Sequence, residues 1–400
     1  MITIKEAKQI INKNLPSPKT NTVSIRKAFE KILAQDIHAP EPSPRFESSA
    51  MDGFAVLWED VKTVRKNSLV VLQIKGESRA GSPYKENIKS GEAIRINTGA
   101  ALPEGANAIV PIEDVKVNDN FAEIVHVKKK FQNIRFRGEE FEEGESLLNK
   151  GERLNPARIG LLASLGITEV KIYQPPKISI LVTGNELIPF HQKPNHGKIR
   201  DSNRIMLSTA IIKAGGEMVF ADQVDDSLDA AVNMIRKVEK ISDIIIFSGG
   251  VSVGQHDHVK EAAGIAGYHS LFWKVRQQPG KPLFLAKKAE KLLFGLPGNP
   301  VSSYICFYYY IQPVIQSLQG KVEAPNTVWG ILSRPIENNT ERDRFLRVKL
   351  KWQEKNNPIV YPLEKQKSHM LTSISNADGF VLIDFDSEIS KDTLVEVTLF

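Results

Sequence analysis

The fold is decided by a nine-residue stretch, Ile178-Ser179-Ile180-Leu181-Val182-Thr183-Gly184-Asn185-Glu186, in which a mostly apolar run ends in a glycine and polar side chains. A short apolar run bounded by such a turn is typical of a buried strand. Three further runs of this kind follow, at Met218–Ala221, Ile244–Phe247 and Leu292–Phe294. Helical segments lie between them, so the pattern predicts a doubly wound α/β sheet with helices on both faces.

The regions that flank this α/β segment, which spans residues 176–320, have other patterns. Residues 46–144 contain short β-rich runs separated by glycine, proline and asparagine, which predicts an all-β domain. Residues 321–400 return to short strands and predict a second, smaller β domain. Residues 1–45 and 145–175 are expected to form one helical domain, so the first β domain would be an insertion into it.

Two helices are expected between Thr3 and His38. The first begins at a capping box, in which Thr3 and Glu6 each satisfy a free backbone N–H group of the other. The second is predicted because four apolar residues share one helical face, namely Ile25, Phe29, Ile32 and Leu33. A further amphipathic helix, from Pro156 to Leu165, is expected to pack with them.

Composition excludes several classes of protein. Of the 400 residues, 41% are hydrophobic and 25% are charged, which is enough for packed cores. No apolar run approaches the ~18 residues of a membrane span. The net charge of +6 comes with no nucleic-acid-binding motif, so neither a membrane nor a nucleic acid is an expected partner. The N-terminus has no signal-peptide pattern and the single cysteine, Cys306, is predicted to be a buried structural thiol, so we expect a cytoplasmic protein.

Each predicted strand of the α/β region ends in polar or glycine-rich sequence. The four loops are Thr183–Glu186, Asp225-Asp226, Ser248–Gly254 and Gly295–Pro300. Ligands of open α/β sheets bind outside the carboxyl ends of the strands, so we expect these loops to converge on one crevice. Glycines allow a ligand to approach the backbone closely and helix N-termini attract anions, which predicts a phosphate-bearing ligand.

Carboxylates on the same rim suggest a divalent cation. Glu186, Asp226 and Asp257 follow three of the predicted strands, and carboxylate oxygens suit Mg²⁺ beside phosphate. The alternative is that Asp226 and Asp257 only cap helices, as aspartate often does. Lys281, on a predicted turn, either binds an oxyanion or is simply exposed to solvent.

The inserted β domain carries polar residues on turns. Asp52, Thr98 and Arg135 lie in three such turns, which also contain glycine, asparagine or acidic residues. Turn chemistry alone would explain each of them, so their residue types by themselves do not define a site.

Eight motifs occur in a fixed order along essentially the whole chain. They are Ser49-Ala50-Met51-Asp52-Gly53, Thr98-Gly99 with Pro103-Glu104-Gly105-Ala106, Asn133-Ile134-Arg135 with Gly138-Glu139, Thr183-Gly184-Asn185-Glu186-Leu187, Asp201-Ser202-Asn203, Ser248-Gly249-Gly250-Val251-Ser252-Val253-Gly254 with Asp257, Pro279-Gly280-Lys281-Pro282 and Leu296-Pro297-Gly298-Asn299-Pro300. In this order they resemble the molybdopterin molybdenumtransferase family, whose animal relative is the C-terminal part of gephyrin.

The resemblance implies an architecture and a reaction. Family members have a helical domain interrupted by a β insertion, an α/β molybdopterin-binding domain and a C-terminal β barrel. They form elongated homodimers in which the insertion of one subunit completes the active site of the other. The implied substrates are adenylylated molybdopterin and molybdate, which enters the dithiolene while AMP is released with the help of Mg²⁺. Contacts with a molybdopterin adenylyltransferase and with acceptor molybdoenzymes are further implications.

The resemblance also assigns roles to residues. The expected catalytic residues are Asp52, Thr98, Glu186, Asp226 and Asp257, and the four carboxylates among them would hold Mg²⁺ and position the pyrophosphate. The expected substrate-binding residues are Arg135, Ser248, Gly249, Gly250, Ser252, Lys274, Lys281, Pro297, Asn299, Pro300, Ser302, Arg342, Arg347 and Ser368. Because the bond that breaks joins two phosphates, positioning and charge neutralisation are expected to dominate over covalent catalysis.

Three residues depart from the family pattern. Gln278 stands where a lysine or arginine is usual, Glu140 where aspartate is common, and Lys367 where glycine is typical. The missing cation at Gln278 matters because molybdate is a dianion that favours charged donors. Arg276 and Lys367 are candidates to compensate for it.

Two other functions fit parts of the pattern. A molybdopterin adenylyltransferase would use the same α/β module, but such relatives have a single domain and carry Gly-Gly-Thr-Gly where this chain has Gly249-Gly250-Val251-Ser252. A non-catalytic molybdopterin-binding scaffold or carrier is the second alternative, since gephyrin clusters receptors on this fold. ATP consumption would identify the adenylyltransferase, and molybdate-dependent AMP release would separate the transferase from the scaffold.

Overall fold

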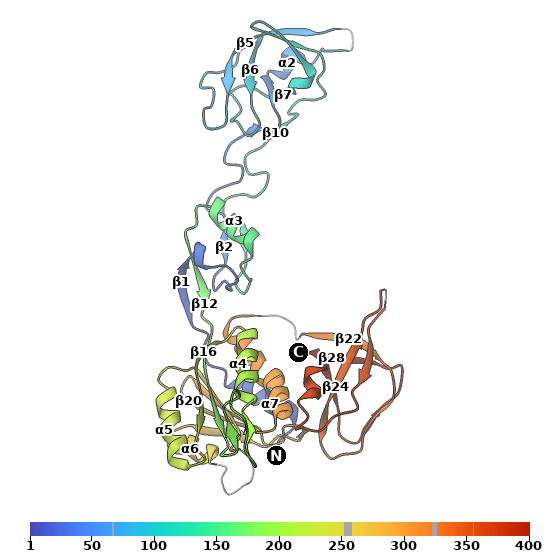
Figure 1. The fold of residues 1–400 in the computed structure, drawn as a ribbon. Coiled ribbons are helices and arrows are strands. Elements are labelled where there is room, and N and C mark those ends of the chain that lie inside the picture. Colours follow the sequence, from blue (N-terminus) through green and yellow to red (C-terminus); the bar gives the residue numbers. More distant parts are fainter. Residues whose placement is uncertain (66–67, 252–257, 322–325, 355) are drawn as a thin grey trace. The chain divides into compact units, whose positions relative to one another are not determined.

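The chain folds into two compact units, seen in the computed structural model of Figure 1. The structure describes residues 1–65, 68–251, 258–321, 326–354 and 356–400. The first unit contains Met1–Gln35, Lys150–Ile159 and Glu169–Phe400, and the second contains Asp36–Asn149 and Gly160–Thr168. The second unit is therefore an insertion into the chain of the first, and the finer division into four domains stays a prediction.

The first unit is built around a six-stranded sheet. Its order is β16 (Glu217–Val224), β13 (Lys177–Thr183), β17 (Ile244–Ser248), β21 (Lys291–Leu296), β20 (Phe284–Lys288) and β18 (His269–Trp273). The first four strands are parallel, and they are the four that the apolar runs predict. Strand β20 is antiparallel to both β21 and β18, so β18 runs in the same direction as the parallel strands. The carboxyl end of β18 therefore lies at the same edge of the sheet as theirs.

Helices cover both faces of this sheet, as predicted. Ile180 and Ile246 point to one face, where they pack with α4 (Asn203–Lys213), α7 (Pro300–Cys306) and α8 (Gln312–Leu318). Leu181 and Phe247 point to the other face, where α5 (Leu228–Val238) and α6 (Val259–Ile265) cover them. Successive residues of each strand are thus buried against opposite faces, as a sheet that is covered on both faces requires.

The N-terminal segment has one of its two predicted helices. Helix α1 (Ile4–Lys13) begins at the predicted Thr3–Glu6 capping box, and its buried face belongs to the α/β core. The helix predicted from Ile25 to Leu33 is wrong. The chain there forms β1 (Thr20–Ser24), which pairs with β12 (Glu169–Tyr173), and one turn of 3₁₀ helix, η1 (Ile25–Lys27).

Long-range backbone pairing explains this difference. Leu33 N–H donates to the carbonyl of Glu152 at 2.9 Å, and Ile32 forms a bridge with Arg153. Glu30 has a φ of 62°, which a right-handed helix does not accept. Ile32 and Leu33 are buried as the pattern suggests, but Phe29 is 56% exposed, and distant segments satisfy the backbone groups of this stretch.

The second unit contains the predicted all-β structure. Its main sheet has the order β7 (Ala108–Pro111), β4 (Gly53–Val56), β6 (Glu92–Ile96), β5 (Val70–Ser78), β9 (Phe121–Ile124) and β8 (Val115–Asn118). Short elements complete it: α2 (Trp58–Val61), η2 (Ile112–Asp114), and the paired strands β3 (Ser48–Ser49) with β10 (Ile134–Arg135) and β2 (Ile37–His38) with β11 (Ser146–Leu148). Helix α3 (Pro156–Ser164) forms where the pattern predicts it.

The C-terminal region forms the expected small β barrel. Five strands close on themselves in the order β24 (Asp343–Lys351), β25 (Ile359–Pro362), β22 (Thr327–Leu332), β28 (Leu394–Leu399) and β26 (Gly379–Ile383), which pairs again with β24. Three short strands and one helical turn flank the barrel: β19 (Gln277–Gln278), β23 (Ile336–Asn338), β27 (Ser387–Ile389) and α9 (Thr372–Ser375). Leu346, Val348 and Val395 are among the residues that fill its interior.

Two further sequence expectations concern the cysteine and the membrane. Cys306 is fully buried in α7, just before the π-helical turn η3 (Phe307–Ile311), and burial raises its pKa to about 12. It is therefore the structural thiol that was predicted. In the described part of the chain, no helix is both long enough and apolar enough to cross a membrane.

Candidate functional site

The loops that follow β13, β17 and β21 meet at the carboxyl edge of the sheet, as predicted. Gly249 N–H donates to the carbonyl of Leu296 at 3.0 Å, which joins two of the loops. A Cβ atom on Gly249 would lie 2.7 Å from the carbonyl oxygen of Thr183, and φ at this position is +101°. Only glycine allows the backbone to pass so close to the β13 loop.

Asn203, the first residue of α4, links two of these loops. Its buried amide donates to Ser248 Oγ at 2.9 Å and to the carbonyl of Gly298 at 2.7 Å. Its Oδ1 is buried and has no hydrogen-bond partner among the described residues. The sequence pattern included Asn203 in a motif but assigned it no role.

Two of the predicted carboxylates lie on neighbouring loops. Asn185 N–H donates to Asp226 Oδ2 at 2.9 Å, so the loop after β16 also reaches the loop after β13. Glu186 is exposed on the same loop, just before the small ladder of β14 (Leu187–Ile188) and β15 (Ile199–Arg200). Ser252 and Asp257 lie outside the described residues.

The predicted Mg²⁺ set of four carboxylates is untested. In the described ranges, no group of three or more histidine, cysteine, aspartate or glutamate side chains is arranged to hold a metal ion. Asp257 lies outside those ranges, and Asp52 belongs to the second unit whereas Glu186 and Asp226 belong to the first.

The end of β18 adds a fifth loop that sequence reasoning did not include. Trp273 Nε1–H donates to the carbonyl of Val251 at 3.0 Å, so its indole lies beside the Gly249-Gly250-Val251 turn. Lys274 Nζ lies 3.8 Å from the centroid of the Trp273 ring, and Lys260 Nζ, from α6, lies 4.2 Å from it. Lys274 was predicted, but Trp273 and Lys260 were not, because only the sheet topology places them at this edge.

The barrel carries a buried arginine beside the α/β domain. Arg347, on β24, is 1% exposed, and its Nη1 donates to the carbonyl of Phe345 at 3.4 Å. Its Nε and Nη2 are buried without a hydrogen-bond partner in the part of the chain that the structure describes. Burial and, secondarily, the charge of Arg344 lower the pKa of Arg347 to about 10.

A loop of the barrel connects Arg347 to α7. Gln366 accepts the backbone N–H of Arg347 at 3.2 Å and donates to its carbonyl at 3.0 Å. Two residues later, the carbonyl of Ser368 accepts the N–H of Val301 at 3.2 Å. These bonds link three segments: the strand of Arg347, the loop of Gln366 and Ser368, and the start of α7, where the buried Ser302 lies.

The remaining predicted residues of this unit are placed as follows. Asn299 precedes α7, and Pro300 is its first residue, directly after the Pro297 turn. Lys281 is exposed, and its carbonyl accepts the N–H of Val275 at 2.9 Å. Arg342 is half-buried just before β24. Gln278, which lacks the usual charge, pairs in register with Arg344 on the neighbouring strand.

The second unit brings its three predicted residues close to one another. Thr98 donates to Asp52 Oδ1 twice, through its backbone N–H at 2.7 Å and its hydroxyl at 3.0 Å. These bonds lower the pKa of Asp52. Arg135 pairs in register with Ser48, and Ser49 O accepts the N–H of Gly99 at 2.8 Å. The turns that carry Asp52, Thr98 and Arg135 therefore form one surface of the β domain.

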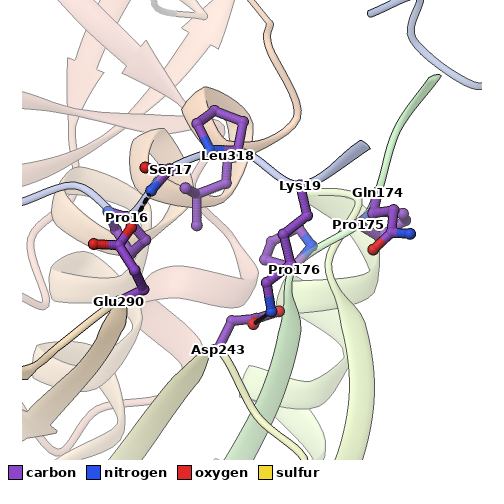
Figure 2. A pocket seen from close by; sticks show the side chains of 10 residues that line it. Pro16, Ser17, Lys19, Gln174, Pro175, Pro176, Asp243, Glu290 and Leu318 are labelled. Carbon is purple, nitrogen blue, oxygen red and sulfur yellow. Dashed lines mark hydrogen bonds and ion pairs between the residues drawn. The ribbon is translucent and has the colours of Figure 1, made fainter. Parts of the chain in front are cut away.

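A separate cavity lies at the opposite, amino edge of the α/β sheet (Figure 2). It has a volume of about 220 Å³ and is lined by four prolines of the two segments that lead to β1 and from β12. Lys19 forms an ion pair with Asp243 at 2.5 Å, and Ser17 N–H donates to Glu290 at 2.6 Å. Asp243 and Glu290 already have partners within the chain. We therefore interpret the cavity as the place where the segments next to β1 and β12 join the sheet, and not as a ligand site.

These features define a class: a protein with an α/β domain whose loops meet at the carboxyl edge of its sheet, an attached barrel and an inserted β domain. Three family models cover the chain: the MoeA N-terminal region (domains I and II) at residues 2–166, the probable molybdopterin-binding domain at residues 179–317, and the MoeA C-terminal region (domain IV) at residues 330–400. The chain belongs to the MoeA family of molybdopterin molybdenumtransferases.

Individual relatives agree along the whole chain. The molybdopterin molybdenumtransferase of Haemophilus influenzae is 33% identical over 388 residues, which cover 96% of this chain and 95% of that protein. That of Staphylococcus aureus is 32% identical over 387 residues, covering 96% and 91%. Two solved structures of the molybdopterin biosynthesis MoeA protein from Pyrococcus horikoshii are similar, with TM-scores of 0.89 and 0.81 at 30% and 27% identity. They cover 100% of this chain and 99% and 100% of their own chains.

Proposed function

We propose that this chain inserts molybdate into adenylylated molybdopterin and releases AMP, which completes the molybdenum cofactor. The structural observation that carries the proposal is Arg347, a buried guanidinium with two unpartnered nitrogens among the described residues. It occurs in a chain that is similar over 96% of its length to molybdopterin molybdenumtransferases.

The burial of the Arg347 guanidinium supports an oxyanion site, because a buried cation loses its hydration. A buried unpaired cation loses several kcal/mol of hydration free energy unless an anion or hydrogen-bond acceptors replace the water. Nε and Nη2 of the planar guanidinium have no acceptor among the described residues, and molybdate is a dianion whose oxygens could accept from both. We assign Ser302 and Ser368 to the same site, because a hydrogen bond from Val301 N–H to the Ser368 carbonyl joins their segments.

Arg344 is a further source of positive charge near this site. It stands opposite Gln278 in the β19–β24 pair and is close enough to Arg347 to lower its pKa. Cross-strand neighbours have their side chains on the same face. Arg344 therefore joins Arg276 and Lys367 as a candidate for the cation that Gln278 does not supply.

The carboxyl edge of the sheet supports binding of the phosphates. Ser248, Gly249 and Gly250 form a turn held against the β13 and β21 loops, so their backbone can approach a ligand. We assign Lys274, Lys281, Pro297, Asn299, Pro300 and Arg342 to the binding of the remaining oxyanions and of the pterin. Positioned cations stabilise charge that develops on the leaving AMP phosphate.

The carboxylates fit a hard cation. Glu186 and Asp226 offer oxygen ligands on adjacent loops, and we assign them, with Asp52 and Asp257, to Mg²⁺. When bound, Mg²⁺ would neutralise the phosphoanhydride oxygens. The hydrogen bonds from Thr98 lower the pKa of Asp52, which favours its carboxylate form and suits that role.

A homodimer would bring the two sets of residues together. We propose that Asp52, Thr98 and Arg135 of one subunit complete the site formed by the α/β domain and barrel of the other. The enzyme would act in the cytoplasm, receive its substrate from a molybdopterin adenylyltransferase and deliver the cofactor to acceptor molybdoenzymes.

The deciding experiment is AMP release from adenylylated molybdopterin by the purified protein with Mg²⁺, titrated with molybdate. The proposal expects release that saturates with molybdate and consumes no ATP. Binding of the adenylylated substrate without release would identify a carrier or scaffold instead. ATP consumption would identify an adenylyltransferase.

A further inference from the structure

Trp273 and two lysines form a cationic cluster beside the Gly249-Gly250-Val251 turn. The indole is fixed to this turn by its hydrogen bond to the Val251 carbonyl at 3.0 Å. Lys274 Nζ and Lys260 Nζ lie 3.8 Å and 4.2 Å from the same ring centroid. The two ammonium groups are therefore separated by no more than about 8 Å, which is within the span of two linked phosphates and their hydrogen bonds.

The charges of this cluster are not neutralised by described parts of the chain. No ion pair joins Lys260 or Lys274 to a carboxylate of the described residues. The electron-rich face of the indole favours a nearby ammonium group and holds it in place without neutralising it. Within the described residues the lysines are therefore available to attract an anion, at the edge where β13, β17 and β21 also end.

The cluster comes from two separate elements. Lys260 lies on α6, which covers one face of the sheet, whereas Trp273 is the last residue of β18 and Lys274 follows it. The backbone of Lys274 is held on both sides, because its carbonyl accepts the N–H of Ile2 at 3.1 Å and its N–H donates to Leu283 at 2.9 Å. Its φ of 69° is unusual for lysine and turns the chain sharply after the strand.

We propose that Lys260 and Lys274 bind the phosphoanhydride of the adenylylated substrate as a pair, and that Trp273 is the positioning residue that holds both ammonium groups beside the Gly249-Gly250 turn. This inference rests on the proposed function, because that function supplies a substrate with two linked phosphates. Lys260 contacts the substrate directly, and Trp273 acts through the two lysines.

Inorganic pyrophosphate is the probe that isolates this site. Calorimetric titration of the wild-type chain, with Lys260→Met and Lys260→Arg, measures its affinity without turnover. Loss of one charged contact is expected to weaken binding about tenfold to a hundredfold, and arginine is expected to restore most of it. Lys237→Met is the matched control, since Lys237 also lies over an aromatic ring, Phe220, at 5.0 Å, but outside the predicted site. It should bind like the wild type.

Kinetics and fluorescence test the role of Trp273. Trp273→Phe keeps a ring but loses the bond to Val251, and Trp273→Leu loses both. We expect the KM for the adenylylated substrate to rise more in Trp273→Leu than in Trp273→Phe, with the KM for molybdate unchanged. Pyrophosphate should change the tryptophan fluorescence of the wild type but not that of Trp273→Phe.

The outcomes separate this inference from the proposed function. An active wild type whose Lys260→Met variant keeps both its pyrophosphate affinity and its KM would overturn the inference and leave the function standing. A wild type that does not bind pyrophosphate would also overturn it. A wild type without molybdate-dependent AMP release, but with Lys260-dependent pyrophosphate binding, would support the anion site and refute the function.

Discussion

Thr98 acts on Asp52 through two hydrogen bonds of different origin, and this leads to a prediction about one pKa. Thr98→Val removes the hydroxyl donor but keeps the backbone N–H, which contributes most to lowering the pKa of Asp52. The pKa should therefore rise while remaining below the ordinary value. A carboxylate whose pKa is lowered in the folded state stabilises the fold at pH values above its ordinary pKa. Any stability that Asp52 contributes is therefore lost as the pH falls through its lowered pKa. Carbon-detected NMR titration of the Asp52 carboxyl would show the change, with Thr22→Val as the control.

Arg347 leads to a prediction in which stability and function change in opposite directions. Arg347→Met keeps much of the volume and removes a buried charge that has no carboxylate partner among the described residues, so the free energy of unfolding should rise by about 1–3 kcal/mol. Molybdate dependence should be lost. Denaturant unfolding and AMP release measure the two effects. The exposed Arg334→Met should leave both nearly unchanged, and a strongly destabilised Arg347→Met would mean that the guanidinium has a structural partner.

Gln278 leads to a prediction about the missing cation. If the charge of Arg276, Lys367 or Arg344 already compensates, Gln278→Lys should lower the molybdate concentration needed for half-maximal activity by less than about threefold, since added like charges repel. Of Lys367→Gly and Arg344→Gln, the variant that removes a compensating charge should then raise that concentration, and adding Gln278→Lys should restore it. Unchanged molybdate dependence in all of these variants would refute compensation.

The loops at the carboxyl edge of the sheet are held together by the close approach of their backbones. Gly249→Ala would place a Cβ 2.7 Å from the Thr183 carbonyl in a left-handed backbone, so the variant should lose more than about 2 kcal/mol of stability and most of its activity. Gly264→Ala, in α6, meets nothing within 4 Å of the added carbon and should be neutral or stabilise by about 0.5–1 kcal/mol. Thermal unfolding of both variants makes the comparison, and equal effects would contradict the close approach of the loops.

At the scale of the whole molecule, the proposal that two subunits share each active site can be tested by mixing subunits. Asp52→Asn and Asp226→Asn should each be inactive alone. Random association of the two variants makes half of the dimers mixed, each with one intact site of two, so about a quarter of the wild-type activity should return. Activity of co-expressed and separately purified proteins provides the measurement. No recovery in proven mixed dimers would place both carboxylates in sites within one chain.

The pattern of the sequence was enough to predict the four parallel strands, the helices between them, the capping box of α1 and the two β domains. It also indicated that the loops after β13, β17 and β21 share one edge, because strand direction follows from strand–helix alternation. These features depend on neighbours along the chain, whose hydrophobic periodicity and turn residues are visible locally. Lys274 and Arg347 came only from the resemblance to a family, and their spacing alone would not have indicated them.

Other features were decided by tertiary structure. The chain from Ile25 to Leu33 has helical spacing, yet pairing with residues 152–154 and 172 replaces the helix. The reversal through β20 turns β18 parallel to the others and brings Trp273 beside Val251. Asp52 gains its lowered pKa from Thr98, 46 residues away. In each case the deciding hydrogen bonds join residues far apart in sequence, and local periodicity does not specify such partners. The four parallel strands and the helices between them were determined by the sequence, because their patterns depend on neighbouring residues.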